Sequence, residues 1–129
     1  MDVHDFGRRY TDAWNSGDPA SVAAFHESDS SLKVNDAEPA VGHEAITEVA
    51  SGFMSGFPDM ELSMDGIEGD ASSAVYRWTF AGTNTGPGGS GRPVRFSGYE
   101  EWTLSEKGLI ARSLGHFDAA DYERQLAGG

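Results

Sequence analysis

The 129-residue chain contains no cysteine and no long apolar run. Without cysteine, disulfide bonds and thiolate metal sites are excluded. The apolar runs are far shorter than the ~20 residues that a membrane-spanning helix needs. The first residues also lack the basic and apolar segments of a signal peptide. We therefore expect a cytoplasmic protein with a single domain over residues 1–129, which is long enough to bury its own core.

Basic residues are also scarce. Lysine and arginine together number 9 against 21 aspartates and glutamates, which gives a net charge of −12. Such a surface repels the phosphates of nucleic acids and the head groups of anionic lipids, so we expect neither a nucleic-acid nor a membrane partner. An acid-rich, lysine-poor and cysteine-free composition is typical of proteins from salt-loving archaea (halophiles), where salt screens the self-repulsion. An ordinary acidic bacterial protein is the alternative.

The N-terminal half has the apolar spacing of helices. One helical face runs through residues 3–14, and Gly17 follows as the expected C-terminal cap. Asp18 and Pro19 are typical of the start of a second, short helix. A third helix is expected after Gly42 and ends near Pro58. Residues 26–35 are expected to form short, irregular strands.

The C-terminal half alternates between apolar and polar residues, which indicates half-buried strands. We expect strands at residues 60–65, 74–83, 94–104 and 109–117, separated by turns that include the glycine-rich residues 86–91. Such an antiparallel meander needs cover on one face, and the three amphipathic helices can supply it. Helices followed by strands indicate an α+β fold.

Alternation also predicts which side chains face the helices. In the second long strand, Tyr76, Trp78 and Phe80 share one face. Large aromatic side chains from the strands and the helices are expected to form the wall of an apolar, substrate-binding pocket. These are Trp14, Phe53, Tyr76, Trp78 and Trp102.

Three polar side chains are expected on the same apolar side of the sheet. Glu100 shares a face with Trp102, and His116 and Asp118 join it if no bulge interrupts the last strand. A carboxylate in an apolar setting is costly, or has a raised pKa. Carboxyl and imidazole groups in an aromatic cavity are suited to acid–base catalysis, so these three are the candidate catalytic residues. No candidate metal ligands stand out.

Structural explanations remain open for each of the three. Glu100 would pair with Arg77 or Arg112 if a bulge rotated one strand. His116 would be a core histidine with satisfied hydrogen bonds. Asp118 would simply cap a helix that begins at Ala119.

Five segments resemble landmarks of the SnoaL-like polyketide cyclases. Residues 77–86 are similar to the family's R-W-x-x-x-G-T-H-T-G segment, with Asn84 in place of the histidine. Residues 91–98 resemble its G-K/R-x-V-x-F-x-G strand, and residues 118–126 resemble its closing D-x(5)-R-Q-L. Residues 42–46 and 57–59 match G-x-E-A-I and F-P-D. The segments occur in the family's order, and the resemblance as a whole runs from about residue 3 to 127.

The resemblance implies the cone-shaped fold shared with nuclear transport factor 2 (NTF2) and ketosteroid isomerase, and a homodimer that packs sheet to sheet. It also implies ring closure by an intramolecular aldol condensation, without metal or organic cofactor. The family uses a histidine on the third long strand and an aspartate on the last strand as its acid–base pair. Glu100 stands at the histidine position here, and the aspartate position falls near Leu114 or Gly115.

Three hypotheses follow for function. The first is a cofactor-independent proton-transfer enzyme, of cyclase or isomerase type, that acts on a small hydrophobic carbonyl compound. Its pocket would measure several hundred Å3. Glu100 would be the base, and His116 or Asp118 would be the acid or the orienting group. The second is a non-catalytic binder of a small hydrophobic molecule. The third is a dimeric interaction module whose pocket is filled by aromatic side chains.

Overall fold

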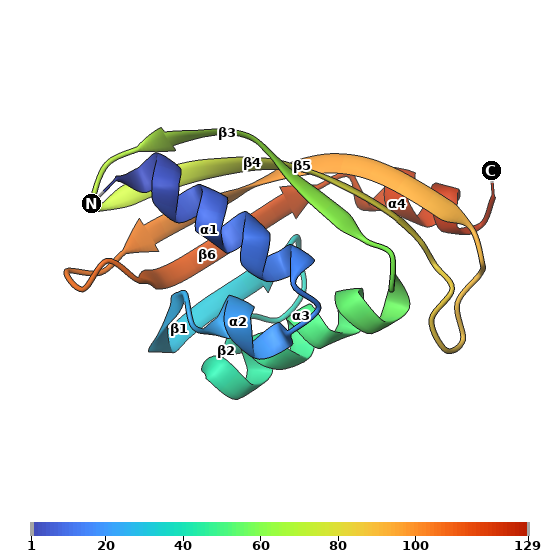
Figure 1. Ribbon diagram of the computed structural model, residues 1–129, viewed down its shortest axis with the longest axis horizontal. Coiled ribbons are helices and arrows are strands. Elements are labelled where there is room, and N and C mark those ends of the chain that lie inside the picture. The colour runs from blue at the N-terminus through green and yellow to red at the C-terminus, as the bar shows by residue number, and fades with distance from the viewer. Residues whose placement is uncertain (1, 129) are drawn as a thin grey trace.

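The computed structural model describes residues 2–128 and has the α+β architecture expected from the sequence. Helices cover one face of a curved, open sheet of six strands (Figure 1). The helices are α1 (Val3–Asn15), α2 (Pro19–Ala23), α3 (His43–Gly56) and α4 (Ala119–Leu126). The strands are β1 (His26–Val34), β2 (Ala40–Val41), β3 (Glu61–Gly69), β4 (Ser73–Thr83), β5 (Pro93–Leu104) and β6 (Ile110–Phe117).

The strand order is β2-β1-β6-β5-β4-β3. Strands β3 to β6 form the antiparallel meander that the alternation predicts. Within residues 26–35 the chain forms the single nine-residue strand β1 and not several short strands, although the pairing of β1 is irregular between His26 and Ser31, as expected. It pairs in parallel with β6, and its register is regular from Ser31 to Val34. This pairing is between strands far apart in the chain, so local patterning does not reveal it.

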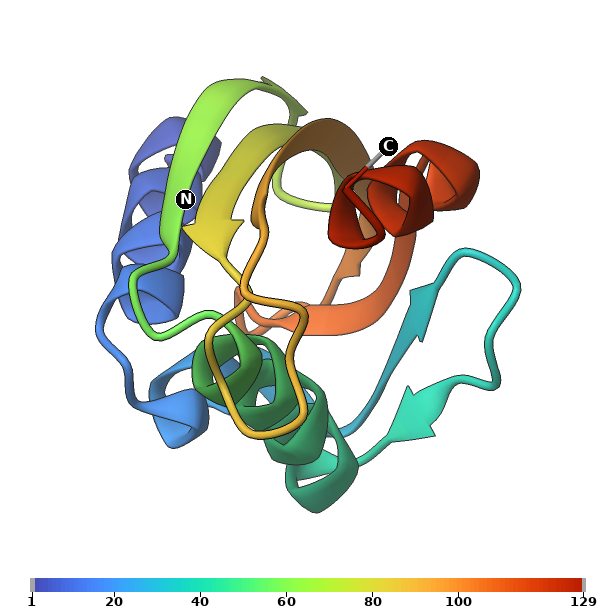
Figure 2. The ribbon, with the colours of Figure 1, turned by 90° about the vertical axis from the view of Figure 1, so that its right-hand side faces the viewer.

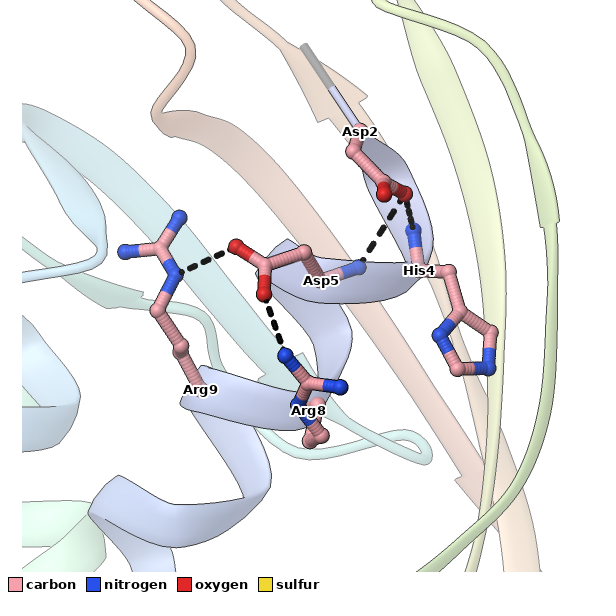
Figure 3. Close-up of polar contacts among 5 residues, drawn as sticks. All are labelled: Asp2, His4, Asp5, Arg8 and Arg9. Atoms are coloured by element: carbon pink, nitrogen blue, oxygen red, sulfur yellow. Dashed lines mark hydrogen bonds and ion pairs between the residues drawn. The ribbon is translucent and has the colours of Figure 1, made fainter.

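Helix α1 begins at a clear N-terminal cap (Figure 3). The Asp2 side chain accepts hydrogen bonds from the backbone N–H groups of His4 and Asp5, at 3.0 and 3.2 Å. Asp5 in turn pairs with Arg8 at 2.6 Å and with Arg9 at 3.1 Å. These ion pairs are exposed and contribute little to stability, so the cap is the stronger signal for where the helix starts.

The opposite side of α1 packs on the sheet. Phe6, Tyr10 and Trp14 lie four residues apart and are buried on one helical face. At the end of the helix, the Asn15 side chain forms two hydrogen bonds with the backbone of Leu62 in β3, at 2.7 and 2.8 Å. The helix is thereby fixed against the sheet with Tyr10 pointing into the core.

Seen from the end of the molecule, the sheet curls round the interior, and α1 and α3 close the remaining sides (Figure 2). Helix α3 buries Ile46, Ala50 and Met54, and the first two lie on the apolar stripe that the sequence predicts. Within residues 2–128, no helix combines the length and apolar character required to span a membrane.

Candidate active site

An apolar cavity lies between the inner face of the sheet, α1 and α3. Its volume is about 70 Å3, which is smaller than the several hundred Å3 that the enzyme hypothesis predicts. Aromatic and aliphatic side chains dominate its wall, and Glu100 is its one acidic residue. The lining residues are Trp14, Leu32, Lys33, Val34, Val49, Phe53, Leu62, Trp78, Phe80, Phe96, Glu100, Ser113, Gly115 and Phe117.

Glu100 lies on the inner face of β5, where strand alternation places it. Its Oε1 accepts three hydrogen bonds from three different elements. The donors are the Tyr10 hydroxyl of α1 at 3.0 Å, the Trp102 indole N–H of β5 at 2.9 Å and the Ser113 hydroxyl of β6 at 2.9 Å. The two arginines considered as partners form no ion pair with Glu100 within the described residues. Neutral donors therefore hold the carboxyl group in place.

The second carboxyl oxygen of Glu100 is free. Within residues 2–128, Oε2 has no hydrogen-bond partner, and it is not among the fully buried unpaired atoms. Glu100 lines the cavity, and its unpaired Oε2 keeps some exposed surface. Burial raises the pKa of Glu100, and the hydrogen bonds from Trp102, Ser113 and Tyr10 offset only part of that rise. The cavity thus contains one carboxyl group with raised proton affinity and one oxygen available to a ligand.

Tyr10 remains a proton donor to Glu100. Burial and the nearby negative charge of Glu100 raise its pKa well above its usual value. The Trp14 N–H lies close enough to the Tyr10 hydroxyl to lower that pKa somewhat, although the two groups do not form a hydrogen bond of normal geometry. The Trp78 indole nitrogen is also buried without a hydrogen-bond partner in the described chain. Besides Glu100, the wall of the cavity therefore includes two indoles, Trp14 and Trp78, whose N–H groups have no hydrogen-bond partner in the described chain.

The predicted inward orientation of His116 was wrong. The register of β5 and β6 shifts between Thr103 and Leu104, and an extra residue in β6 reverses the alternation after Ile110. His116 therefore lies opposite Tyr99 on the outer face of the sheet. The two rings stack with centroids 4.7 Å apart, and His116 Nε2 is 3.0 Å from a carboxylate oxygen of Glu101.

Asp118 does not reach the cavity either. It is exposed, and its side chain accepts a hydrogen bond from the Asp121 backbone N–H at 3.1 Å, which makes it the N-terminal cap of α4. This is the structural explanation that the sequence left open. His116 and Asp118 instead border a separate, more polar hollow together with Lys33 and Asp36. Of the three candidate catalytic residues, the structure brings only Glu100 to the cavity.

The five predicted wall residues divide into two groups. Trp14, Phe53 and Trp78 line the cavity. Tyr76 and Trp102 do not, because their rings stack on each other with centroids 4.9 Å apart and are almost completely buried. The latter two form the packed core beside Glu100, and Trp102 acts as a donor to it.

Two contributors to the site were missed by sequence reasoning. Tyr10 lies in the helix predicted over residues 3–14, where it counted only as part of the apolar face, and Ser113 was not singled out. A tyrosine in an otherwise apolar helical stripe was the available signal for the first, because a buried hydroxyl needs a partner. No sequence signal was available for Ser113, because its inward orientation depends on the bulge in β6. Among residues 2–128, no three histidine, aspartate or glutamate side chains gather as a metal site requires.

The chain is similar to one known protein family and to several solved structures. The family model for SnoaL-like polyketide cyclases matches residues 4–126. No match was found among curated protein sequences. TsrD from Streptomyces laurentii has a similar structure, with a TM-score of 0.82 and 23% identity over 98% of this chain and 96% of that one.

Two further structures share the fold. An NTF2-like protein of unknown function from Burkholderia pseudomallei has a TM-score of 0.83 and 18% identity, covering 98% of each chain. A hypothetical protein with a ketosteroid isomerase-like fold from Catenulispora acidiphila has a TM-score of 0.82 and 10% identity, covering 95% of this chain and 92% of that one. These likenesses show the cone-shaped fold shared with NTF2 and ketosteroid isomerase, and the match over residues 4–126 shows that the chain belongs to the SnoaL-like polyketide cyclase family.

Proposed function

We propose that the cavity binds a small, mainly apolar carbonyl compound and that Glu100 transfers a proton at the carbon next to the carbonyl. The observation that carries this proposal is the unequal use of the two Glu100 oxygens. Three donors hold Oε1, while Oε2 has no partner in the described chain. A carboxylate that is oriented on one side and free on the other is suited to act as a general base.

The raised pKa of Glu100 favours the same chemistry. Burial is its main cause. A general base works best when its pKa lies near the working pH, because it must be ionised and still accept a proton readily. An ordinary exposed glutamate is a weaker base. The apolar wall around Glu100 therefore strengthens it for removing a proton from carbon.

The proposed step needs no co-reactant. Glu100 Oε2 takes the proton, the C–H electron pair forms a new carbon–carbon double bond, and the carbonyl electrons move onto oxygen to form an enolate. If the protonated Glu100 swaps its proton with solvent water before returning one to the same carbon, the result is exchange. If it returns the proton to a different carbon of a conjugated substrate, the result is isomerisation. For a substrate with a second carbonyl group, attack of the enolate carbon on it forms a ring, and Glu100 protonates the new alkoxide.

Glu100 acts without the family's acid–base pair. It stands at the position of the family's histidine, and the residue opposite it in β6 is Gly115, which is near where the family's aspartate falls. One group therefore has to remove and return the proton. This requirement fits simple proton transfer better than a reaction that needs a separate acid and base.

The test is exchange of carbonyl-adjacent protons for deuterium. Acetone and cyclopentanone in D2O are incubated with the wild-type protein and followed by proton NMR. Glu100→Gln keeps an acceptor oxygen for the three donors but cannot take a proton, so exchange should fall by about 100-fold or more. Glu101→Gln is the matched control, because Glu101 pairs with His116 on the outer face. Undiminished exchange by Glu100→Gln would exclude Glu100 as the base.

A non-catalytic binder of a small apolar molecule is the second candidate. The three hydrogen bonds to Oε1 favour it, because they join α1, β5 and β6 and give Glu100 a structural role. This function predicts cyclopentanone binding without exchange. Affinity that does not change between about pH 5 and 8 would support it, since a titrating base would alter binding.

A further inference from the structure

Two glycines lie on the inner face of the sheet next to Glu100, and they differ in what surrounds them. A Cβ atom at Gly98 would lie 2.2 Å from the His116 carbonyl oxygen and 2.6 Å from Cζ2 of Trp78. No side chain fits there, so the close approach of Trp78 explains this glycine.

Gly115 is much less confined, because the backbone of Lys33 would have to move by only a few tenths of an ångström to admit a Cβ atom. A Cβ atom there would meet only the Lys33 carbonyl oxygen at 3.2 Å and Cγ of Glu100 at 3.9 Å, with nothing else within 4 Å. Its backbone is not in the left-handed region that favours glycine. Glycine weakens a strand, and it often marks a place where a ligand or another backbone approaches closely. The Lys33 carbonyl oxygen approaches one side of Gly115, and the other side is open. The room left by the absent side chain is therefore the feature to explain.

That room belongs to the cavity. Gly115 lines the cavity wall and is paired directly with Glu100 across β5 and β6. Side chains paired in this way are neighbours on one face of a sheet. The space over Gly115 thus lies beside the carboxyl group of Glu100.

We propose that Gly115 determines the size of the molecule that the cavity accepts, because the part of the ligand nearest Glu100 occupies the space over Gly115. The identity of the reacting group rests on the proposed function, whereas the size limit does not depend on it. The proposal assigns Gly115 as a specificity-determining residue. A methyl group at this position shortens the cavity where the reacting carbon has to lie.

The test compares Gly115→Ala with the wild type on ligands of two sizes. Binding of acetone and cyclopentanone is measured by NMR chemical-shift changes, and cyclopentane serves as a probe without a carbonyl group. The added methyl group should weaken binding of both five-membered rings by about tenfold or more and should change acetone binding much less. Gly52→Ala is the control, because Gly52 is exposed on α3 with nothing within 4 Å of its Cβ position.

The outcomes separate this inference from the proposed function. Equal binding of the rings by Gly115→Ala and wild type overturns the inference, even if wild type exchanges protons. Size discrimination without exchange supports the inference and argues against the proposed chemistry. If Gly115→Ala does not fold, nuclear Overhauser effects measured on the wild-type protein provide the test. Bound cyclopentanone or cyclopentane should show such effects to the Gly115 Hα protons. Effects confined to other residues would refute the inference.

Discussion

At the scale of single residues, Glu100 couples the candidate chemistry to stability. Its pKa is raised in the folded protein, mainly by burial. The native state therefore holds the proton more tightly than the unfolded state does. This favours folding at low pH, and the advantage is lost as pH rises from the ordinary value of 4.5 through the folded pKa.

The Glu100→Gln variant should not show this loss of folding stability with rising pH. The variant keeps the acceptor oxygen but carries no charge, so we expect it to be at least as stable as wild type at neutral pH. The difference should grow by about 1.4 kcal/mol for each pH unit between the two pKa values. Urea unfolding from pH 4 to 8 measures it. A stability advantage of the variant that shrinks as pH rises would contradict the raised pKa.

His26 affects the stability of the fold at acidic pH. It is buried, with Nδ1 3.0 Å from the Ser30 hydroxyl, and Nε2 has no partner among the described residues. Burial, together with the charge of His43, lowers the pKa of His26 to about 4. The unfolded state then binds the proton first, so stability falls as pH drops from about 6.5 to 4.

The expected loss from His26 is about 3 kcal/mol over that interval, because each pKa unit corresponds to about 1.4 kcal/mol. NMR titration of the native protein provides the direct check. The ring signals of His26 should move only near pH 4, or disappear there as the protein unfolds. A midpoint above pH 6 would show that the imidazole is not desolvated in the way its burial indicates.

At the scale of elements, the packing of β4 on β5 and β6 depends on a glycine. The indole of Trp78 reaches across β5 at Gly98 and contacts Phe96 and Phe117, with ring centroids 5.6 and 6.0 Å away. Strand order and register place these residues together. The sequence pattern alone predicts the face of each strand but not this crossing.

Gly98→Ala should destabilise the fold by about 2–4 kcal/mol, because the new methyl group overlaps the backbone of β6 and the Trp78 ring. Gly66→Ala in β3 is the comparison, since its Cβ position has nothing within 4 Å. That change should be within about 0.5 kcal/mol. Chemical denaturation of both variants tests this, and equal effects would mean that the sheet relaxes around the added group.

At the scale of the whole molecule, the outer face of the sheet is the surface that we propose for self-association. Tyr99 is a large side chain there with 37% of its surface exposed, stacked on His116 and approached by the Arg77 guanidinium. We propose that two copies pack through this face, as the family resemblance implies. With a net charge of −12 on each copy, salt should strengthen the association by screening repulsion.

Light scattering coupled to size-exclusion chromatography tests the homodimer. Wild type should have twice the 13.8 kDa mass of one chain, with more dimer at high salt. Tyr99→Asp places a negative charge in the centre of the proposed interface and should give monomers that still fold, as shown by circular dichroism. A monomeric wild type at both salt concentrations would rule out this interface.

Much of the architecture could be predicted from the sequence, because helical and strand periodicities are local. The apolar stripes and caps located the first three helices, and alternation located the four strands of the meander. Alternation also placed Glu100 on the inner face. These predictions hold since the side chain of a residue in a regular strand must point opposite to its neighbour's.

The composition of the site was decided by tertiary structure. The bulge in β6 turned His116 outward and Ser113 inward, and a single inserted residue is enough to do so because the period of a strand is two. The donors to Glu100 come from residues 10, 102 and 113, which only the folded chain brings together. By itself the sequence determined that a carboxyl group lies among aromatic side chains. The long-range packing of α1, β5 and β6 determined that one oxygen is held and the other left free.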